Sequence, residues 1–290
     1  MSTVRVDTIA GMLVVFVVAG ALSALVERRW HALSRAPYFA RSRLTDWVYW
    51  PFTAFVTGNL TRLVTLGALG CVVFALGYRG APRGLLAWLE TDRRFGLGWL
   101  PAPAQFFIAL CVGDFVNYWN HRLRHTRWLW PFHAVHHAPR TLDWLAASWM
   151  HPVDDLLDNV GVGLVLLAIG TSPSVWLATG PFFFFFNMWL HANLSWRCGP
   201  LAYVIATPAF HRWHHAEGPS ARPCNFADFL PLWDLLFGTF HLPDGLPSSV
   251  GPGDTPVPAG LLAQLAFPFR RRRAAQPSSH RALGRSQQSV

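Results

Sequence analysis

The sequence predicts an all-α integral membrane protein: a bundle of about four or five membrane-spanning helices, capped on its cytoplasmic side by a histidine-rich region. Composition, long apolar segments and clustered histidines support this fold class. Of the 290 residues, 52% are hydrophobic and 13% are charged, and this charged share is about half that of a typical soluble protein. The chain also carries 15 tryptophans and 22 phenylalanines, as expected of aromatic belts at a membrane interface.

The positive charge is interpreted as a membrane feature. The formal net charge is +9, and every basic side chain is arginine, with no lysine. The arginines flank apolar segments without forming a continuous stripe, which indicates a positive-inside bias and contact with anionic headgroups. We therefore expect no nucleic-acid partner. The four cysteines are scattered without a C-x-x-C pair, so no disulfide framework is predicted.

The first 104 residues are predicted to form transmembrane and interfacial helices. The apolar run 8–26 is long enough to cross the ~30 Å hydrocarbon core. It is followed by E-R-R and no small-residue cleavage site, which favours a membrane helix over a signal peptide. The arginines after it place the next segment in the cytoplasm. Residues 44–58 are rich in aromatic side chains and are expected at the interface, leading into a second span over 60–77.

A loop on the opposite membrane side is expected over residues 78–102, which contain several prolines and glycines. A third span begins near Pro103 and carries helix beyond the lipid boundary. The apolar stretch 156–192 is broken by G-T-S-P at 170–173, which predicts a helical hairpin. The histidine-bearing domain covers residues 105–245, and residues 246–290 are predicted to be a disordered basic tail at the lipid surface.

Three histidine clusters dominate the middle of the chain. His121 and His125 stand four residues apart, so on a helix they share a face. Two H-x-x-H-H clusters follow, and each is expected to direct its imidazoles at one centre. They are His133, His136 and His137, and His211, His214 and His215. A single histidine in an apolar chain is usually a hydrogen-bonded core residue, but three such clusters predict metal binding, because neutral imidazole is the commonest metal ligand.

The number of clustered histidines predicts two metal ions, since one first-row ion takes four to six ligands. Nitrogen ligands with few carboxylates exclude calcium and magnesium, and a structural zinc site usually includes cysteine. Two redox-active ions with open positions could bind dioxygen. Asn187 and His191, also four apart, should return to the same membrane level on the hairpin. Aspartates are expected to accept imidazole N–H groups, and the candidates are Asp114, Asp154, Asp155, Asp158, Asp228 and Asp234.

The motifs together resemble the fatty acid hydroxylase / sterol desaturase superfamily of integral-membrane di-iron oxygenases. The resemblance covers roughly residues 105–241. The motifs are D-F-V-N-Y-W-N-H-R-L-R-H, F-H-A-V-H-H, L-H-A-N-L, T-P-A-F-H-R-W-H-H and N-F-A-D-F-L-P-L-W-D-L-L-F-G-T-F. By motif match, the three clusters are the family's three histidine boxes, and His191 is the additional histidine before the third box. His151, in H-P-V-D-D, matches a position near the site.

The resemblance implies two non-haem iron ions as cofactors and O2 as co-substrate. It also implies a membrane lipid substrate, fatty acyl, sterol or related, that is hydroxylated or desaturated, with ether cleavage as another outcome within the superfamily. The chain lacks a cytochrome or ferredoxin-like segment, so electrons would come from a separate ferredoxin- or cytochrome-type protein with its reductase. Arginines near the boxes suit either such an acidic donor or lipid headgroups: Arg122, Arg124, Arg127, Arg140 and Arg212. The expected location is a bacterial-type inner membrane, with the boxes and the C-terminus cytoplasmic.

Two other classes of protein are considered. A histidine-rich metal transporter or metal-handling membrane protein would place its ligands within the spans near the midplane, whereas these histidines flank the predicted spans. A membrane zinc hydrolase would need a general-base glutamate in a motif such as H-E-x-x-H, and the sequence has none. The sequence therefore favours an oxygenase, and a metal-handling membrane protein is the alternative hypothesis.

Overall fold

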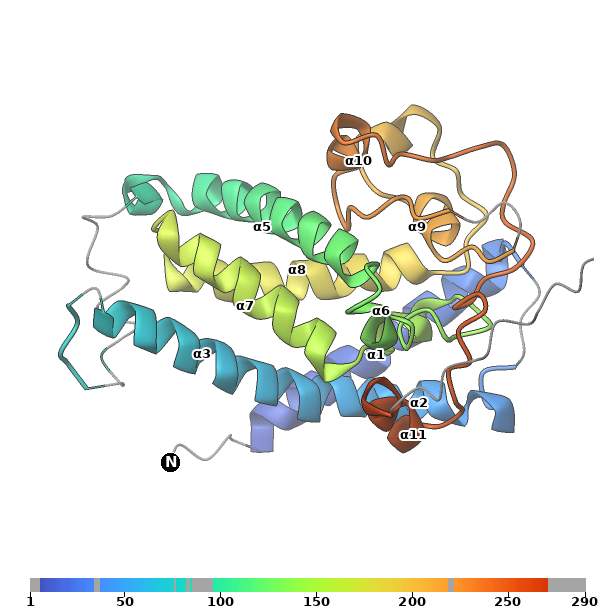
Figure 1. The fold of residues 1–290 in the computed structure, drawn as a ribbon, viewed down its shortest axis with the longest axis horizontal. Helices are drawn as coiled ribbons and strands as arrows, with labels where there is room; N and C mark the ends of the chain where they lie inside the picture. The colour runs from blue at the N-terminus through green and yellow to red at the C-terminus, as the bar shows by residue number, and fades with distance from the viewer. Residues whose placement is uncertain are drawn as a thin grey trace, which may run out of the picture.

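The computed structural model describes residues 6–33, 37–75, 77–81, 84, 96–218 and 222–270. Within these ranges the regular structure is helical, and the only β-type pairings are two isolated bridges, His31 with Leu194 and Ala216 with Val250. Long helices form a bundle, and short helices gather at one end of it as a cap (Figure 1). The predicted all-α class is therefore confirmed.

The N-terminal part contains α1 (Val6–Trp30) and a second helical stretch made of α2 (Leu44–Pro51), a π-helical turn (Phe52–Thr57) and α3 (Gly58–Ala75). Proline removes one backbone donor inside a helix, and the wider π turn lets the helix continue past Pro51. In the described part of the chain, one helical stretch, Arg41–Ala75, is long and apolar enough to cross a membrane. The span count of four or five stays a prediction.

The core of the bundle is formed by α5 (Ala102–Arg124), α7 (Pro152–Ala168) and α8 (Pro173–His191). Helix α7 packs against both α3 and α5 (Figure 1). Glycines on α7 permit the close approach. A Cβ added to Gly161 would lie 2.9 Å from the Asn120 side chain on α5, and one on Gly163 would lie 3.2 Å from Thr65 on α3.

The turn between α7 and α8 forms the hairpin that the sequence predicts. Gly170 has φ of 69°, a left-handed conformation that glycine adopts without a steric penalty. The Thr171 hydroxyl donates to the Leu166 carbonyl (3.0 Å), and the Ser172 amide donates to Oε1 of Gln105 on α5 (2.8 Å). These bonds attach the far end of the hairpin to α5.

The cap is assembled from short helices that bracket the histidines. Phe115 and Trp119 on α5 pack edge-to-face on Trp233 and Phe237, each with ring centroids 4.9 Å apart, so α10 lies beside the last turns of α5 (Figure 1). The short elements are α6 (Trp130–His133), a 3-10 turn (Trp144–Ser148), another (Gly199–Tyr203), α9 (Pro208–His214), α10 (Leu232–Leu236), α11 (Leu261–Ala266) and a last 3-10 turn (Phe267–Phe269).

Helix α1 is attached to the cap by Glu27, which is fully buried. Its Oε1 accepts the backbone amides of Trp144 (2.9 Å) and Asn193 (3.0 Å), and its Oε2 accepts the Tyr38 hydroxyl. A buried carboxylate needs such donors to offset the loss of hydration. The C-terminal end of α1 is thereby fixed against the segment that follows α8.

The predicted tail is folded over part of its length. The sequence assigned residues 246–290 to a disordered tail, whereas residues 246–270 pack on the cap: Val250 is buried, and the Gly251 amide donates to the His215 carbonyl (3.1 Å). The indole of Trp130 donates to the Thr255 hydroxyl (2.8 Å). These contacts give the segment enough buried partners to be ordered. Residues 271–290 and most of the predicted loop 78–102 lie outside the described residues.

Candidate metal centre

Nine histidines from four elements converge in two groups at the junction of bundle and cap. Eight of them are buried, and His125 is partly exposed. Within each group the ring nitrogens nearest the centre lie within 4.8 Å of one another. The five-histidine group is His121, His125, His133, His137 and His214, and the four-histidine group is His136, His191, His211 and His215.

The structure divides each H-x-x-H-H cluster between the two groups. The sequence expectation was that each cluster serves one centre, and this was wrong. His133 and His137, four apart, stay together, while His136 joins the other group. The third cluster repeats this division, with His214 separated from its two neighbours. The ring centroids of His137 and His215, from different groups, lie 4.3 Å apart, so the two groups are adjacent, as a two-metal site requires.

The four-histidine group contains facing lone pairs. Nδ1 of His136 lies 2.9 Å from the Trp149 carbonyl, and Nδ1 of His191 lies 2.9 Å from the Asn187 carbonyl. A carbonyl oxygen only accepts, so both Nδ1 atoms carry the proton, and both Nε2 atoms of these neutral rings are bare acceptors. The two Nε2 atoms nevertheless approach to 3.3 Å. Two lone pairs at this separation repel each other unless a cation lies between them.

The five-histidine group follows the same pattern. Nδ1 of His121 donates to the Phe226 carbonyl and Nδ1 of His214 to the Cys224 carbonyl, both at 2.8 Å. Nε2 of His214 is then buried without a hydrogen-bond partner among the described residues, and Nε2 of His121 lies 3.1 Å from Nε2 of His133. Nε2 of His214 is therefore an orphaned acceptor, which is costly in a protein interior, so the donor set fits a metal ion.

Burial keeps the cap histidines neutral. Removal from water lowers the pKa of His136 to about 4 and that of His214 to about 3. The same cause lowers the pKa of His137, His211 and His215 well below the usual value. At neutral pH these rings are therefore unprotonated at one nitrogen, the form in which imidazole binds a metal.

The orienting carbonyls of Cys224 and Phe226 belong to one short segment, residues 224–230, held by two buried carboxylates. Asp234 accepts the amides of Phe226 (2.8 Å) and Ala227 (2.9 Å). Asp114, on α5, accepts the amides of residues 228–230 at 2.8–3.2 Å and the Trp233 indole at 2.9 Å. Both aspartates thus act on the backbone that faces the histidines and lie outside the two histidine groups.

Asn225 fixes the middle of this segment. It has φ of 56°, one of two left-handed non-glycine residues in the described chain. Its side-chain amide donates to the carbonyls of Phe210 (2.8 Å) and His241 (2.7 Å), and its Oδ1 accepts the His241 amide (2.7 Å). The side-chain bonds stabilise the unusual backbone conformation, which aims the carbonyls on either side of it at two different histidines.

His151 and Asn187 lie beside the site, and neither side chain joins a histidine group. His151 caps the N-terminus of α7, with Nδ1 accepting the Val153 amide (3.1 Å) and Nε2 donating to the Leu265 carbonyl (3.2 Å), and it belongs to neither group. The Asn187 side chain donates to the Ala147 carbonyl (3.1 Å), and only its backbone carbonyl serves His191.

Among the aspartates expected beside imidazole, Asp154 comes nearest to a ring. Its Oδ2 lies 3.4 Å from Nδ1 of His133. Beside it, the guanidinium of Arg124 pairs with Asp158 at 2.9 Å. The arginine prediction is therefore corrected: Arg124 and Arg212 are buried, and Arg212 donates to the Ala192 carbonyl (3.1 Å). Neither is available to an electron donor or a headgroup.

The backbone acceptors that orient the rings were missed at the sequence level. Trp149, Cys224 and Phe226 act through their carbonyl oxygens, so their side chains give no signal. Asp114 and Asp234 were among the candidate aspartates, but they accept backbone amides of residues 226–230 instead of imidazole N–H groups.

Residues 106–239 match the family model for fatty acid hydroxylase, and this range contains all nine histidines. The chain thus carries a domain of the fatty acid hydroxylase family, and the resemblance seen in the motifs is confirmed. An ornithine lipid hydroxylase, OlsE of Rhizobium tropici, is 37% identical over 175 residues, which cover 59% of this chain and 52% of that protein.

Other relatives carry different activities in their names. The alkylglycerol monooxygenase of Homo sapiens is 30% identical over 153 residues, covering 52% of this chain and 34% of that protein. A very-long-chain aldehyde decarbonylase of Oryza sativa subsp. indica is 28% identical over 139 residues, covering 43% and 21%. The chain thus spans about half or less of the length of these relatives. No solved structure matches it.

Proposed function

We propose that this protein is a membrane-bound non-haem di-iron oxygenase that hydroxylates or desaturates a lipid, using O2 and electrons from a separate protein. The observation that carries the proposal is the pair of adjacent histidine groups, in which Nε2 atoms face one another at 3.1–3.3 Å and those of His136 and His191 are both bare. Nitrogen-only donors favour iron, zinc or copper over magnesium or calcium. The fatty acid hydroxylase domain favours iron among these.

The protein's own residues would hold and prepare the metals. Carbonyl acceptors at Nδ1 would fix the tautomer and orientation of four rings, those of His121, His136, His191 and His214, and such partners also raise ligand basicity. Oδ2 of Asp154 lies 3.4 Å from Nδ1 of His133 without a hydrogen bond between them, so that ring has no such partner among the described residues. Burial would exclude bulk water from the reacting centre. Two ferrous ions held there would supply the electron transfer to dioxygen that oxidation of an unactivated C–H bond requires.

The substrate is proposed to be a lipid with a long alkyl chain. The named relatives act on an ornithine lipid, an alkylglycerol and a very-long-chain aldehyde. These molecules share an alkyl chain and differ in the polar group, so the class is supported and the particular head group is left open. Fold and family do not by themselves determine the outcome of the reaction.

We further propose that the protein lies in a bacterial-type inner membrane with the histidine cap and the C-terminus in the cytoplasm. The arginines that reach the surface, Arg122, Arg127 and Arg140, would then face either an acidic electron donor or lipid headgroups. The metal-handling alternative is not favoured, because the matching family is fatty acid hydroxylase and the relatives are named for a lipid hydroxylase and an alkylglycerol monooxygenase.

The test combines metal content with product analysis. Protein purified in mild detergent after anaerobic, iron-replete growth should hold about two irons per chain, because the histidines exceed one coordination sphere. Lipid extracts from cells with and without the gene should differ by the gain of one oxygen or the loss of two hydrogens, measured by mass spectrometry. One metal per chain, or zinc after such preparation, would contradict the di-iron assignment.

Histidine variants supply the control. His137→Ala and His214→Ala should lose iron and product together, since an open metal site with one ligand missing loses affinity and geometry. His31 and His241 lie outside both histidine groups, so His31→Ala and His241→Ala should keep both the bound iron and the product. His280 was also expected to be a bystander and lies outside the described residues. Equal loss in all four variants would point to folding rather than metal binding.

A further inference from the structure

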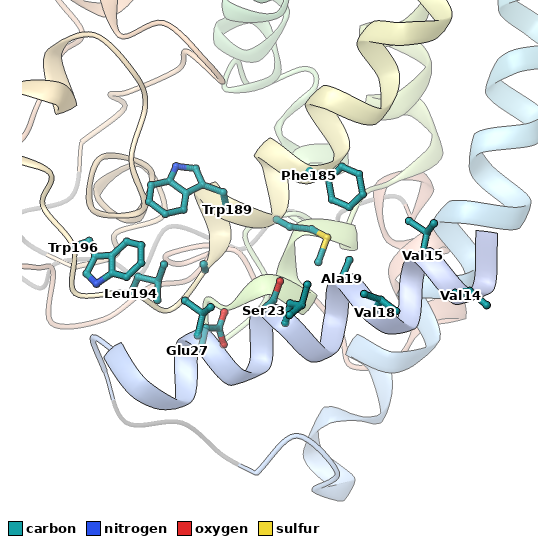
Figure 2. A pocket seen from close by; sticks show the side chains of 14 residues that line it. Val14, Val15, Val18, Ala19, Ser23, Glu27, Phe185, Trp189, Leu194 and Trp196 are labelled. Atoms are coloured by element: carbon teal, nitrogen blue, oxygen red, sulfur yellow. The ribbon is translucent and has the colours of Figure 1, made fainter. Parts of the chain in front are cut away.

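An apolar groove of about 680 Å³ runs between α1 and the end of α8 (Figure 2). On the α1 side it is lined from Val14 to Glu27, and on the other side by residues between Phe185 and Trp196. The volume lies within the range of about 300–1,000 Å³ typical of small-molecule sites. In Figure 2, Phe185 and Trp189 face α1 across it, and Trp196 forms one end. None of these residues belongs to the histidine groups.

We propose that this groove binds one alkyl chain of the lipid substrate, with the lipid's head group at the Glu27 end. This inference rests on the proposed function, and it assigns the place where the alkyl chain of the substrate binds. The lining side chains are almost entirely aliphatic or aromatic, and the mouth is open, because Val14 and Val18 are 61% and 51% exposed. A groove that opens on hydrocarbon admits a chain directly from the bilayer, without passage through water.

The length of the groove suits a single chain. At 1.5 Å per residue, the helix from Val14 to Glu27 measures roughly 20 Å. Each leaflet contributes about half of the ~30 Å hydrocarbon core, so a lipid chain reaches about 15 Å from the interface. A chain of that reach, together with its head group at the Glu27 end, therefore spans the groove as far as Val14.

The two ends of the groove differ in chemistry. At the Glu27 end, Trp196 packs on Trp30 with ring centroids 5.4 Å apart. The Arg29 guanidinium lies 5.4 Å from the centre of the Trp30 ring. Arg28 and Arg29 are exposed on the last turn of α1. Tryptophan and arginine in this arrangement are typical of the headgroup level of a membrane, and the two guanidinium groups suit an anionic or zwitterionic head.

The groove shares a wall with the segment that carries His191 of the metal centre. Met188 and Ala192 line the groove, and they lie on either side of His191 along α8 and its C-terminal residue. The carbonyl of Ala192 is held by Arg212 (3.1 Å), so this wall is fixed. The part of the chain closest to the head group would thus lie nearest to the four-histidine group, and the distal methyl end would lie at Val14.

A tryptophan placed at the distal end should shorten the groove. Val14→Trp is expected to move the alkyl chains found among oxidised cellular lipids toward shorter lengths, raising the ratio of shorter to longer chains at least several-fold. Val17→Trp is the matched control, because Val17 is also on α1 and 67% exposed but does not line the groove. Iron content and melting temperature, measured on both variants, show whether each one folds. The same chain-length profile in both variants would overturn the proposal.

A photo-crosslinking experiment on the unaltered protein tests the site without a variant. The probe is palmitoyl phosphatidylglycerol with a diazirine on the terminal carbon, in vesicles of the same lipid. Crosslinks mapped by mass spectrometry should concentrate near Val14 and Val18, and crosslinks elsewhere would overturn the proposal. Crosslinks there without any chain-length shift in Val14→Trp would indicate a structural lipid and also overturn it. If the unaltered protein forms no oxidised lipid at all, the proposed function fails, and the crosslinks still decide whether the groove binds a chain.

Discussion

At the scale of single residues, Asp234 is expected to control metal affinity without touching a histidine. Its carboxylate accepts two backbone amides and the Thr239 hydroxyl (2.6 Å), and one of those amides belongs to Phe226, whose carbonyl orients His121. In Asp234→Asn the new NH2 group would face a donor, and the segment would shift. Iron affinity, measured by chelator titration, should fall about 10–100-fold, as is typical when a ligand's hydrogen-bond partner is lost.

Asp114→Asn provides the comparison for that experiment. Asp114 is an equally buried acceptor, but it holds residues 228–230, which provide no carbonyl to a histidine. The variant should lower the melting temperature while changing iron affinity much less than Asp234→Asn. Equal loss of iron in the two variants would mean that residues 224–230 act only through overall stability.

His151 illustrates a histidine whose importance is predicted to be structural. It caps α7 and holds the Leu265 carbonyl, so His151→Ala should lower stability by about 1 kcal/mol, the usual cost of a lost N-cap, and leave iron bound. Thermal unfolding and iron content would be measured together. Asparagine is a good N-cap residue, so His151→Asn should recover most of the stability. Loss of iron at unchanged melting temperature would contradict this role.

At the scale of elements, the packing of α7 on α5 should depend on Gly161. A larger residue would collide with Asn120, whose side chain donates to the Leu157 carbonyl (3.1 Å), and overpacking of this kind costs about 1–3 kcal/mol. Gly161→Val should therefore lower the melting temperature in detergent. Gly180→Val on α8 is the control, since nothing lies within 4 Å of a Cβ there. If Gly161→Val and Gly180→Val lowered the melting temperature equally, the cause would be the low helix propensity of valine and not a collision between α7 and α5.

The elements also show what the sequence could and could not predict. The hairpin of α7 and α8 was predictable, because apolar runs and the G-T-S-P turn are local signals. The division of each H-x-x-H-H cluster was not, since it depends on where α9 packs. The acceptor for His121 is 105 residues away in the chain, and no local pattern marks it. The segment 246–270 appeared disordered because its few apolar residues find their partners only in the folded cap.

At the scale of the whole molecule, the arrangement of bundle and cap makes a topological prediction. Helix α5 has 23 residues, so it is roughly 35 Å long and exceeds the ~30 Å hydrocarbon core. It connects the end of the bundle near Gly96–Trp99 to the cap (Figure 1), and His121 and His125 lie at its cap end. The segment after α3, including the exposed Arg79, lies at that far end, and Trp128 and Leu262 lie in the cap. The two ends should therefore face opposite sides of the membrane.

Single cysteines in a background without Cys71, Cys111, Cys198 and Cys224 would test this prediction. Trp128 and Leu262 are 72% and 80% exposed, so Trp128→Cys and Leu262→Cys should react with a membrane-impermeant maleimide from the cytoplasmic side only. Arg79→Cys should react from the opposite side only. Val17→Cys, exposed but expected within the hydrocarbon, should react from neither side, because the reagent is confined to water. Labelling of Arg79→Cys and Trp128→Cys from one side would mean that α5 does not cross the bilayer, and that the cap and bundle share a single aqueous face.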